Sequence, residues 1–184
     1  MKTRILVLLV LSIVMVGCSP APKPEAEKPA AAAPAATAPM VHGNLAQVMR
    51  AIMFPNSNVI YYVQDKDPKS IKQAKDPSTA VNILESTYGG WDAVENSSIA
   101  LAEAANLLMI PGRKCSNGKD VPMRNEDWPK LVQGLRDAGM TAYKAAQTKN
   151  MDNILMATDA LTTACGNCHD KYRDKPGGNA NRCM

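Results

Sequence analysis

Two cysteines and a histidine near the C-terminus of this 184-residue chain have the spacing of a haem-attachment motif. The segment reads Cys165-Gly-Asn-Cys168-His169, which is C-x-x-C-H. On a helix, thiols at positions i and i+3 lie on one face, so both can add to the vinyl groups along one edge of a porphyrin. The imidazole of His169 then supplies the proximal nitrogen to the iron. The motif therefore predicts one covalently bound haem c per chain.

The same cysteines fit two other chemistries less well. A thioredoxin-like redox pair needs a βαβ setting and a helix N-terminus, whereas this pair is predicted to lie deep in a helix. A zinc site needs a second pair of ligands, but the other histidine is His42 and the remaining cysteines are isolated in the sequence. Haem attachment is the prediction that the residues favour.

The N-terminal segment is typical of a bacterial lipoprotein signal. Lys2 and Arg4 precede an apolar run over 5–16, which ends in Gly17-Cys18. We expect residues 1–17 to be a signal peptide and Cys18 to be lipidated, with the protein on the periplasmic side of a bacterial membrane. An ordinary secretory signal with an incidental cysteine is the alternative.

A Pro/Ala-rich tether is expected between the lipid and the folded part. Residues 19–40 contain six Pro and nine Ala, a composition that cannot form a packed core. The predicted organisation is lipidated Cys18 and tether over 18–41, then a haem-binding domain over 42–184. The formal charge of +4 is spread thinly, which does not suggest a nucleic-acid binder.

Apolar residues recur at helical spacing in four stretches, and no segment alternates like a strand. The first begins after Asn44 and is ended or kinked at Pro55. The second runs from about Val81 or Trp91 to Met109. The third starts near Asp127, and the fourth follows Asn150 and ends before Pro176. Polar loops are expected over 65–80 and 112–124. The fold class predicted is all-α, a four-helix bundle whose C-terminal helix carries the haem motif.

The residues after the motif extend it to Cys165-Gly-Asn-Cys168-His169-Asp-Lys-Tyr172-Arg173, and in this the chain resembles the class II c-type cytochromes. That family includes cytochrome c-prime and low-spin relatives such as cytochrome c-556. The segment Gln47-Val48-Met49-Arg50 is also similar to the family's first helix. Over about 42–175 the resemblance implies an antiparallel four-helix bundle and a distal haem residue at Met49. It also implies a homodimer formed along the first helix, as an expectation.

The sixth iron position is the open question of the site. A thioether at Met49, on the inward face of the first helix, is a plausible soft ligand for haem iron. Met53 lies one turn further along, and His42 would give ligation by two histidines. The alternative is that Met49 and Met53 only fill the core.

Four further side chains have expected places in the bundle. Arg173 is expected either to pair with a haem propionate or to be solvated at the helix end, and Tyr172 to pack beside the porphyrin. Trp91 and Trp128 open two helices and are expected in the core.

Two further cysteines, Cys115 and Cys183, remain beyond the lipidated cysteine and the two of the motif. They are expected to form a disulfide in an oxidising compartment or to remain as two surface thiols.

These features predict a one-electron carrier anchored to a membrane by lipid. No general base or substrate pocket is implied, so we do not expect an enzyme. The expected partners are redox proteins, a dehydrogenase or an oxidase. One alternative is a five-coordinate haem that binds nitric oxide or carbon monoxide. Another is a haem subunit docked permanently to a dehydrogenase.

Overall fold

A computed structural model describes residues 39–180, 182 and 183 of the chain. This part is all-α, as predicted, and within it the only β-type pairing is an isolated bridge between Lys114 and Asp120. The α-helices are α1 (Leu45–Val48), α2 (Phe54–Tyr61), α3 (Trp91–Ala104), α4 (Trp128–Gln147) and α5 (Met151–Cys168). The predicted signal peptide 1–17, Cys18 and nearly all of the tether over 18–41 lie outside the described residues.

The first helical segment is continuous across Pro55, where we expected a break. Asn44 caps α1, and it forms a capping box with Gln47. A π-helix, η1 (Met49–Met53), then connects α1 to α2. The α-helix resumes at Phe54, so Pro55 lies in the first turn of α2. Proline is tolerated in a first turn, because a backbone N–H there would have no α-helical partner. The expected interruption is therefore replaced by a local change of helical register.

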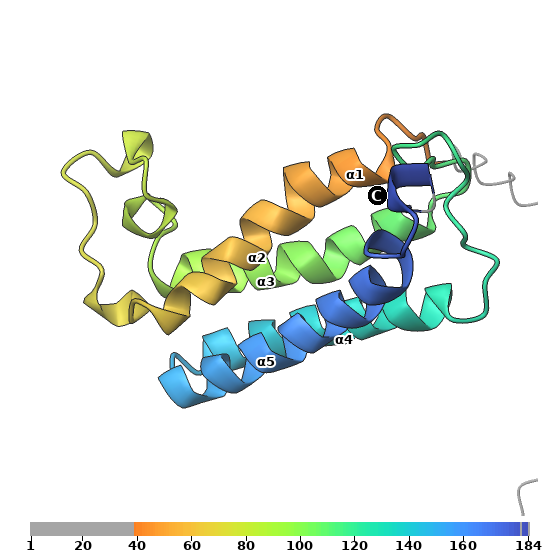
Figure 1. Ribbon diagram of the computed structural model, residues 1–184. Helices are drawn as coiled ribbons and strands as arrows, with labels where there is room; N and C mark the ends of the chain where they lie inside the picture. The colour runs from red at the N-terminus through yellow and green to blue at the C-terminus, as the bar shows by residue number, and fades with distance from the viewer. Residues whose placement is uncertain (1–38, 181, 184) are drawn as a thin grey trace, which may run out of the picture. The chain divides into compact units, whose positions relative to one another are not determined.

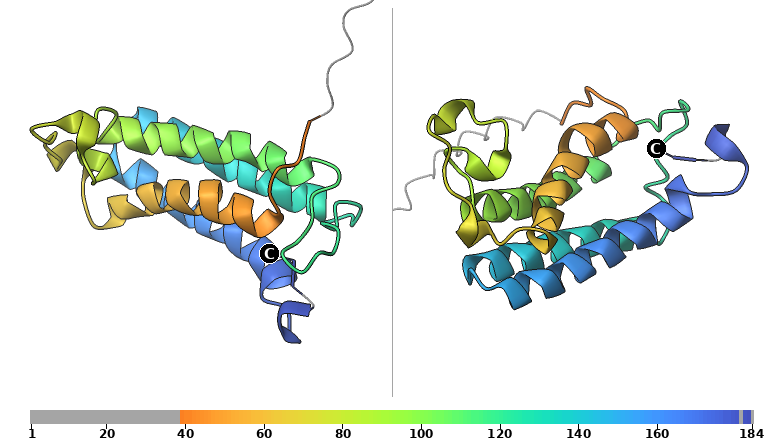
Figure 2. Two further views of the ribbon diagram at one scale, coloured as in Figure 1. Left: turned by 90° about the horizontal axis from the view of Figure 1, so that it is seen from above. Right: turned by 60° about the vertical axis from the view of Figure 1, so that its left-hand side comes forward.

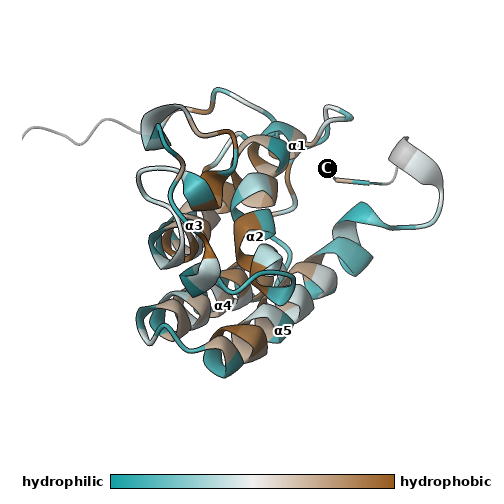
Figure 3. Ribbon diagram, turned by 90° about the vertical axis from the view of Figure 1, so that its left-hand side faces the viewer, coloured by the Kyte–Doolittle hydropathy of each residue, from teal (hydrophilic) through white to brown (hydrophobic). Residues whose placement is uncertain are grey.

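The helices pack side by side through faces rich in small residues. α3 packs against α2 and α4, and α4 packs against α5 (Figure 1). A Cβ on Gly139 of α4 would lie 2.9 Å from the backbone nitrogen of Ala102, so glycine lets α4 approach α3 closely. Figure 3 views these helices nearly end-on. The predicted apolar stripes form their shared core, for example Leu101, Ala142, Ile154 and Leu161.

The connection between α2 and α3 lacks a long helix, which agrees with the predicted polar loop over 65–80. It contains only short 3-10 turns, such as Pro68–Ser70 and Pro77–Thr79. The second long helix starts at Trp91, the later of the two predicted starts, because Val81 is fully exposed and Gly90 (φ 57°) turns the chain just before Trp91. α3 then tightens into a 3-10 segment, η6 (Ala105–Met109).

The last helix carries the predicted haem-attachment motif at its C-terminal end. Asn150 caps α5 by accepting a hydrogen bond from the backbone N–H of Asn153 (3.1 Å). After Cys168 the helix continues as a π-helix, η7 (His169–Arg173). Figures 1 and 2 place this end of α5 beside α1 and the 112–124 loop, and the 65–90 segment at the opposite end of the helices. Within the described residues, no helix is long and apolar enough to cross a bilayer.

Candidate functional site

A largely apolar cavity of about 330 Å³ lies between the first helical segment and the end of α5. α1, η1 and α2 form one wall, α5 and η7 another, and α3, η6 and α4 close the interior. The volume falls within the range of cofactor sites. Its apolar lining includes Leu45, Leu101, Leu108, Leu131, Val132 and Leu135.

Cys165, Cys168 and His169 all line this cavity. Neither cysteine forms a disulfide. Burial raises the pKa of Cys165, and burial followed by the nearby Cys165 raises the pKa of Cys168 to about 11. A thioredoxin-like pair requires a lowered pKa, so this environment disfavours that alternative. Burial lowers the pKa of His169, which favours the neutral imidazole that binds metals.

Met49 and Met53, the two methionines proposed as distal ligands, also line the cavity. Met49 is half-buried at the start of η1, and Met53 is buried at its end. The five residues of the π-helix η1 separate the two methionines by about one helical turn, so both thioethers lie on the same wall of the cavity. His42 is exposed before α1 begins and is absent from the lining, so the structure does not bring it to the site.

Tyr172 and Trp128 close one side of the cavity. Tyr172 is 4% exposed, and its ring packs edge to face against Trp128 with centroids 4.9 Å apart. The Tyr172 hydroxyl donates to Asp127 Oδ1 (2.7 Å) and accepts a hydrogen bond from Asn125 (3.1 Å). The Trp128 indole N–H donates to the carbonyl of Leu108 (3.3 Å). Packing fixes both rings. Trp128 lies in the core, as predicted, and the expected place of Tyr172 beside a porphyrin stays a prediction.

Two arginines line the cavity, and both are exposed. The guanidinium of Arg173 donates to both carboxylate oxygens of Asp174 (2.8 and 2.7 Å). Arg50, next to Met49, has no carboxylate within ion-pair distance in the part of the chain that the structure describes. Sequence reasoning assigned no role to Arg50, because a lone arginine at a helical position is usually a solvated cation.

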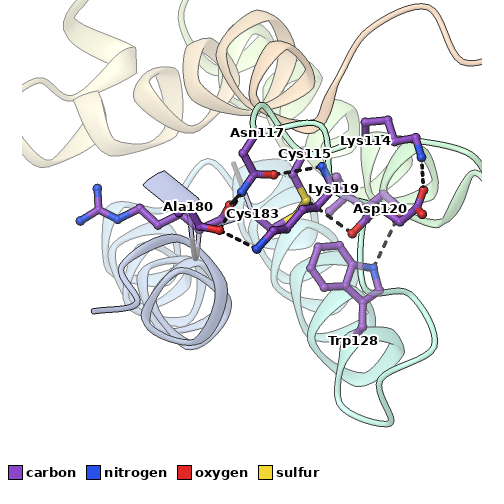
Figure 4. The surroundings of a disulfide bond; sticks show 10 residues. Lys114, Cys115, Asn117, Lys119, Asp120, Trp128, Ala180 and Cys183 are labelled. Atoms are coloured by element: carbon purple, nitrogen blue, oxygen red, sulfur yellow. Dashed lines mark hydrogen bonds and ion pairs between the residues drawn. A yellow bond between two sulfur atoms is a disulfide. The ribbon is translucent and has the colours of Figure 1, made fainter. Parts of the chain in front are cut away.

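Cys115 and Cys183 form a disulfide that attaches the C-terminal tail to the 112–124 loop (Figure 4). The backbone N–H of Cys183 also donates to the carbonyl of Tyr172 (2.9 Å), and Cys183 lines the haem-motif cavity. Arg113, buried to 3% exposure, donates from Nε to the carbonyl of Leu107 (2.9 Å) and from Nη1 to that of Gly43. These contacts hold the loop against the start of α1.

Among residues 39–180, 182 and 183, no group of three or more His, Cys, Asp or Glu side chains is placed to hold a metal ion. The arrangement instead suits a prosthetic group bonded through Cys165 and Cys168, with His169 as a single imidazole ligand. No protein-family model matches the chain, and no curated protein or solved structure is significantly similar to it.

Proposed function

We propose that the chain is a monohaem c-type cytochrome of class II that carries single electrons. The observation that carries the proposal is the convergence of Cys165, Cys168 and His169 on one apolar cavity that Met49 also lines. The packing of α2, α3, α4 and α5 supports a second part of the proposal, an antiparallel four-helix bundle in which the segment Leu45–Tyr61 acts as the first helix.

Each site residue has a distinct task in this proposal. The thiols of Cys165 and Cys168 would hold the haem covalently, through thioether bonds to its vinyl groups. His169 would be the imidazole ligand of the iron, and its lowered pKa favours the neutral, ligating form of the ring. Arg50 and Arg173 suit the two propionates, since both are cations that line an otherwise apolar cavity.

Met49 is proposed as the second axial ligand. When bound, haem supplies an iron that changes reversibly by one electron. Two fixed axial ligands and a buried apolar lining limit the rearrangement that accompanies this change. The leucines, Trp128 and Tyr172 exclude water from the site, and the lining offers no carboxylate that could act as a general base.

Export and lipid attachment at Cys18 remain part of the proposal. A lipid-anchored protein on a Pro/Ala-rich tether could exchange electrons with dehydrogenases or oxidases in the same membrane. Cys18→Ser is expected to move the protein from the membrane fraction to the soluble fraction. Mature protein that starts elsewhere and carries no acyl mass would contradict this part alone.

Acid–acetone extraction tests covalent attachment. Haem is expected to stay on the wild-type protein, while the double variant Cys165→Ala/Cys168→Ala yields no holoprotein. The matched control is Cys115→Ala/Cys183→Ala, which also removes two cysteines but leaves the motif intact and should retain covalent haem. Haem that extracts freely from the wild type would overturn the proposal.

A further inference from the structure

A second cavity, of about 170 Å³, lies beside the disulfide. Cys183 and Tyr172 line both cavities, so the second adjoins the proposed haem site. Its other walls come from the 112–124 loop and from the tail, which are held together by the disulfide (Figure 4). The proposed function gives this second cavity no task.

Three cations line this cavity, against one carboxylate. They are Lys119, Lys175 and Arg182. Asp120 is the only carboxylate of the lining, and it pairs with Lys114 outside the cavity. In the described part of the chain, none of the three cations has a carboxylate within ion-pair distance. The cavity therefore has an excess of positive charge.

Arg182 gives the strongest indication of a missing acceptor. Its Nε is buried and has no hydrogen-bond partner among the described residues. A buried guanidinium N–H without an acceptor is costly, and native structures rarely leave one unpaired. The backbone around it is fixed, because the Asn117 side chain donates to the Arg182 carbonyl (2.6 Å) and the next residue is disulfide-bonded Cys183. The backbone of Arg182 is thus held in place at a cavity that Lys119 and Lys175 also line.

We propose that this cavity binds a small oxyanion through Arg182, with Lys119 and Lys175 supplying further positive charge. A carboxylate or phosphate group has the acceptor oxygens that an arginine fork and two ammonium groups require. The oxyanion is either free in solution or a propionate that extends from the adjoining haem cavity. An anion held next to Tyr172 would stabilise the oxidised, more positive haem and lower its reduction potential.

The first arm of the test is calorimetric titration of the purified full-length protein with inorganic phosphate at low ionic strength. Saturable binding of one phosphate is expected. Arg182→Gln should weaken it roughly tenfold or more, because a charge-assisted hydrogen bond is lost. Lys175→Gln should weaken it less, and Arg124→Gln is the matched control. Arg124 is exposed and lines neither cavity, so its loss should leave phosphate binding unchanged.

The second arm detects a propionate. If a propionate occupies the cavity, phosphate will not bind to the haem-bearing protein, but Arg182→Gln will shift the propionate-bending band of the resonance Raman spectrum and Arg124→Gln will not. A haem-bearing protein that neither binds phosphate in an Arg182-dependent way nor shows this shift would overturn the proposal. The phosphate arm does not require haem, so failure of the haem proposal would leave it standing.

Discussion

Trp128 and Tyr172 pack edge to face, with ring centroids 4.9 Å apart, and both line the larger cavity, while Tyr172 also lines the second. The pair joins the start of α4 to the π-helix that follows the haem motif. Asp127, adjacent to Trp128, accepts a hydrogen bond from Tyr172 and forms an ion pair with Lys171 (both 2.7 Å). One aromatic contact and one carboxylate therefore help to fix the end of the helix that carries Cys165 and Cys168.

Removing the ring of Tyr172 is expected to cost far more stability than removing its hydroxyl. Tyr172→Ala leaves a cavity against Trp128 and should lower the free energy of unfolding by about 3–5 kcal/mol. Tyr172→Phe keeps the ring contact and should cost only about 1 kcal/mol, for the hydrogen bond to Asp127. Urea unfolding followed by circular dichroism measures both. Equal losses for the two variants would show that the hydroxyl, rather than packing, holds this helix end.

Because of Asp127, the folded protein is expected to lose stability in acid. Hydrogen bonds from Lys171, and then from Tyr172, lower the pKa of Asp127. Its folded pKa therefore lies below the unfolded value of about 3.9, so the stabilisation is present above that pH and disappears as pH falls through the folded pKa. Asp127→Asn should reduce the difference in unfolding free energy between neutral and acid pH. Asp159→Asn, on the exposed side of α5, is the control and should change this difference less.

The disulfide is expected to stabilise the folded protein and retain the tail. It joins residues separated by 68 positions, and a native disulfide of this kind contributes about 2–4 kcal/mol. Cys115→Ser/Cys183→Ser should lower the unfolding free energy by about that amount and make the chain after Tyr172 sensitive to protease. A tail that remains protected without the disulfide would mean that the hydrogen bonds from Asn117 and Lys119 suffice to hold it.

Met49 and Met53 should respond differently to substitution. Losing a thioether ligand removes a bond that favours ferrous iron, so Met49→Ala should give a high-spin haem with a lower reduction potential and rapid carbon monoxide binding. Met53→Ala should disturb packing and keep the low-spin spectrum. Optical spectra and potentiometric titration distinguish the two variants. The reverse pattern would move the ligand one turn along η1, to Met53.

Local signals predicted the helices well. The apolar spacing is encoded within a few residues, and the first and fourth helices begin after Asn44 and Asn150, as predicted. Pro55 was expected to end or kink the first helix, and it does not end it. The π-helix before it accommodates the proline, and apolar spacing does not reveal such a change of register. The choice between Val81 and Trp91 depended on burial, which the sequence alone could not decide.

The site was predictable only where its residues are close in sequence. Cys165, Cys168 and His169 form a contiguous motif, and Met49 was found through a family resemblance. Arg50 reaches the same cavity from a different helix, and the cations of the second cavity come from a loop and a tail brought together by the disulfide. Such groupings are set by tertiary packing, so no spacing rule could have found them.

The optical spectrum of the native protein, oxidised and then reduced without added ligands, tests the central claim most directly. A one-electron carrier with His169 and Met49 as axial ligands should be low-spin in both states, and carbon monoxide should bind it slowly. A high-spin ferric spectrum with rapid carbon monoxide binding would contradict this account and favour a gas-binding haem protein. A purified chain with no haem absorption would contradict the proposed cofactor itself.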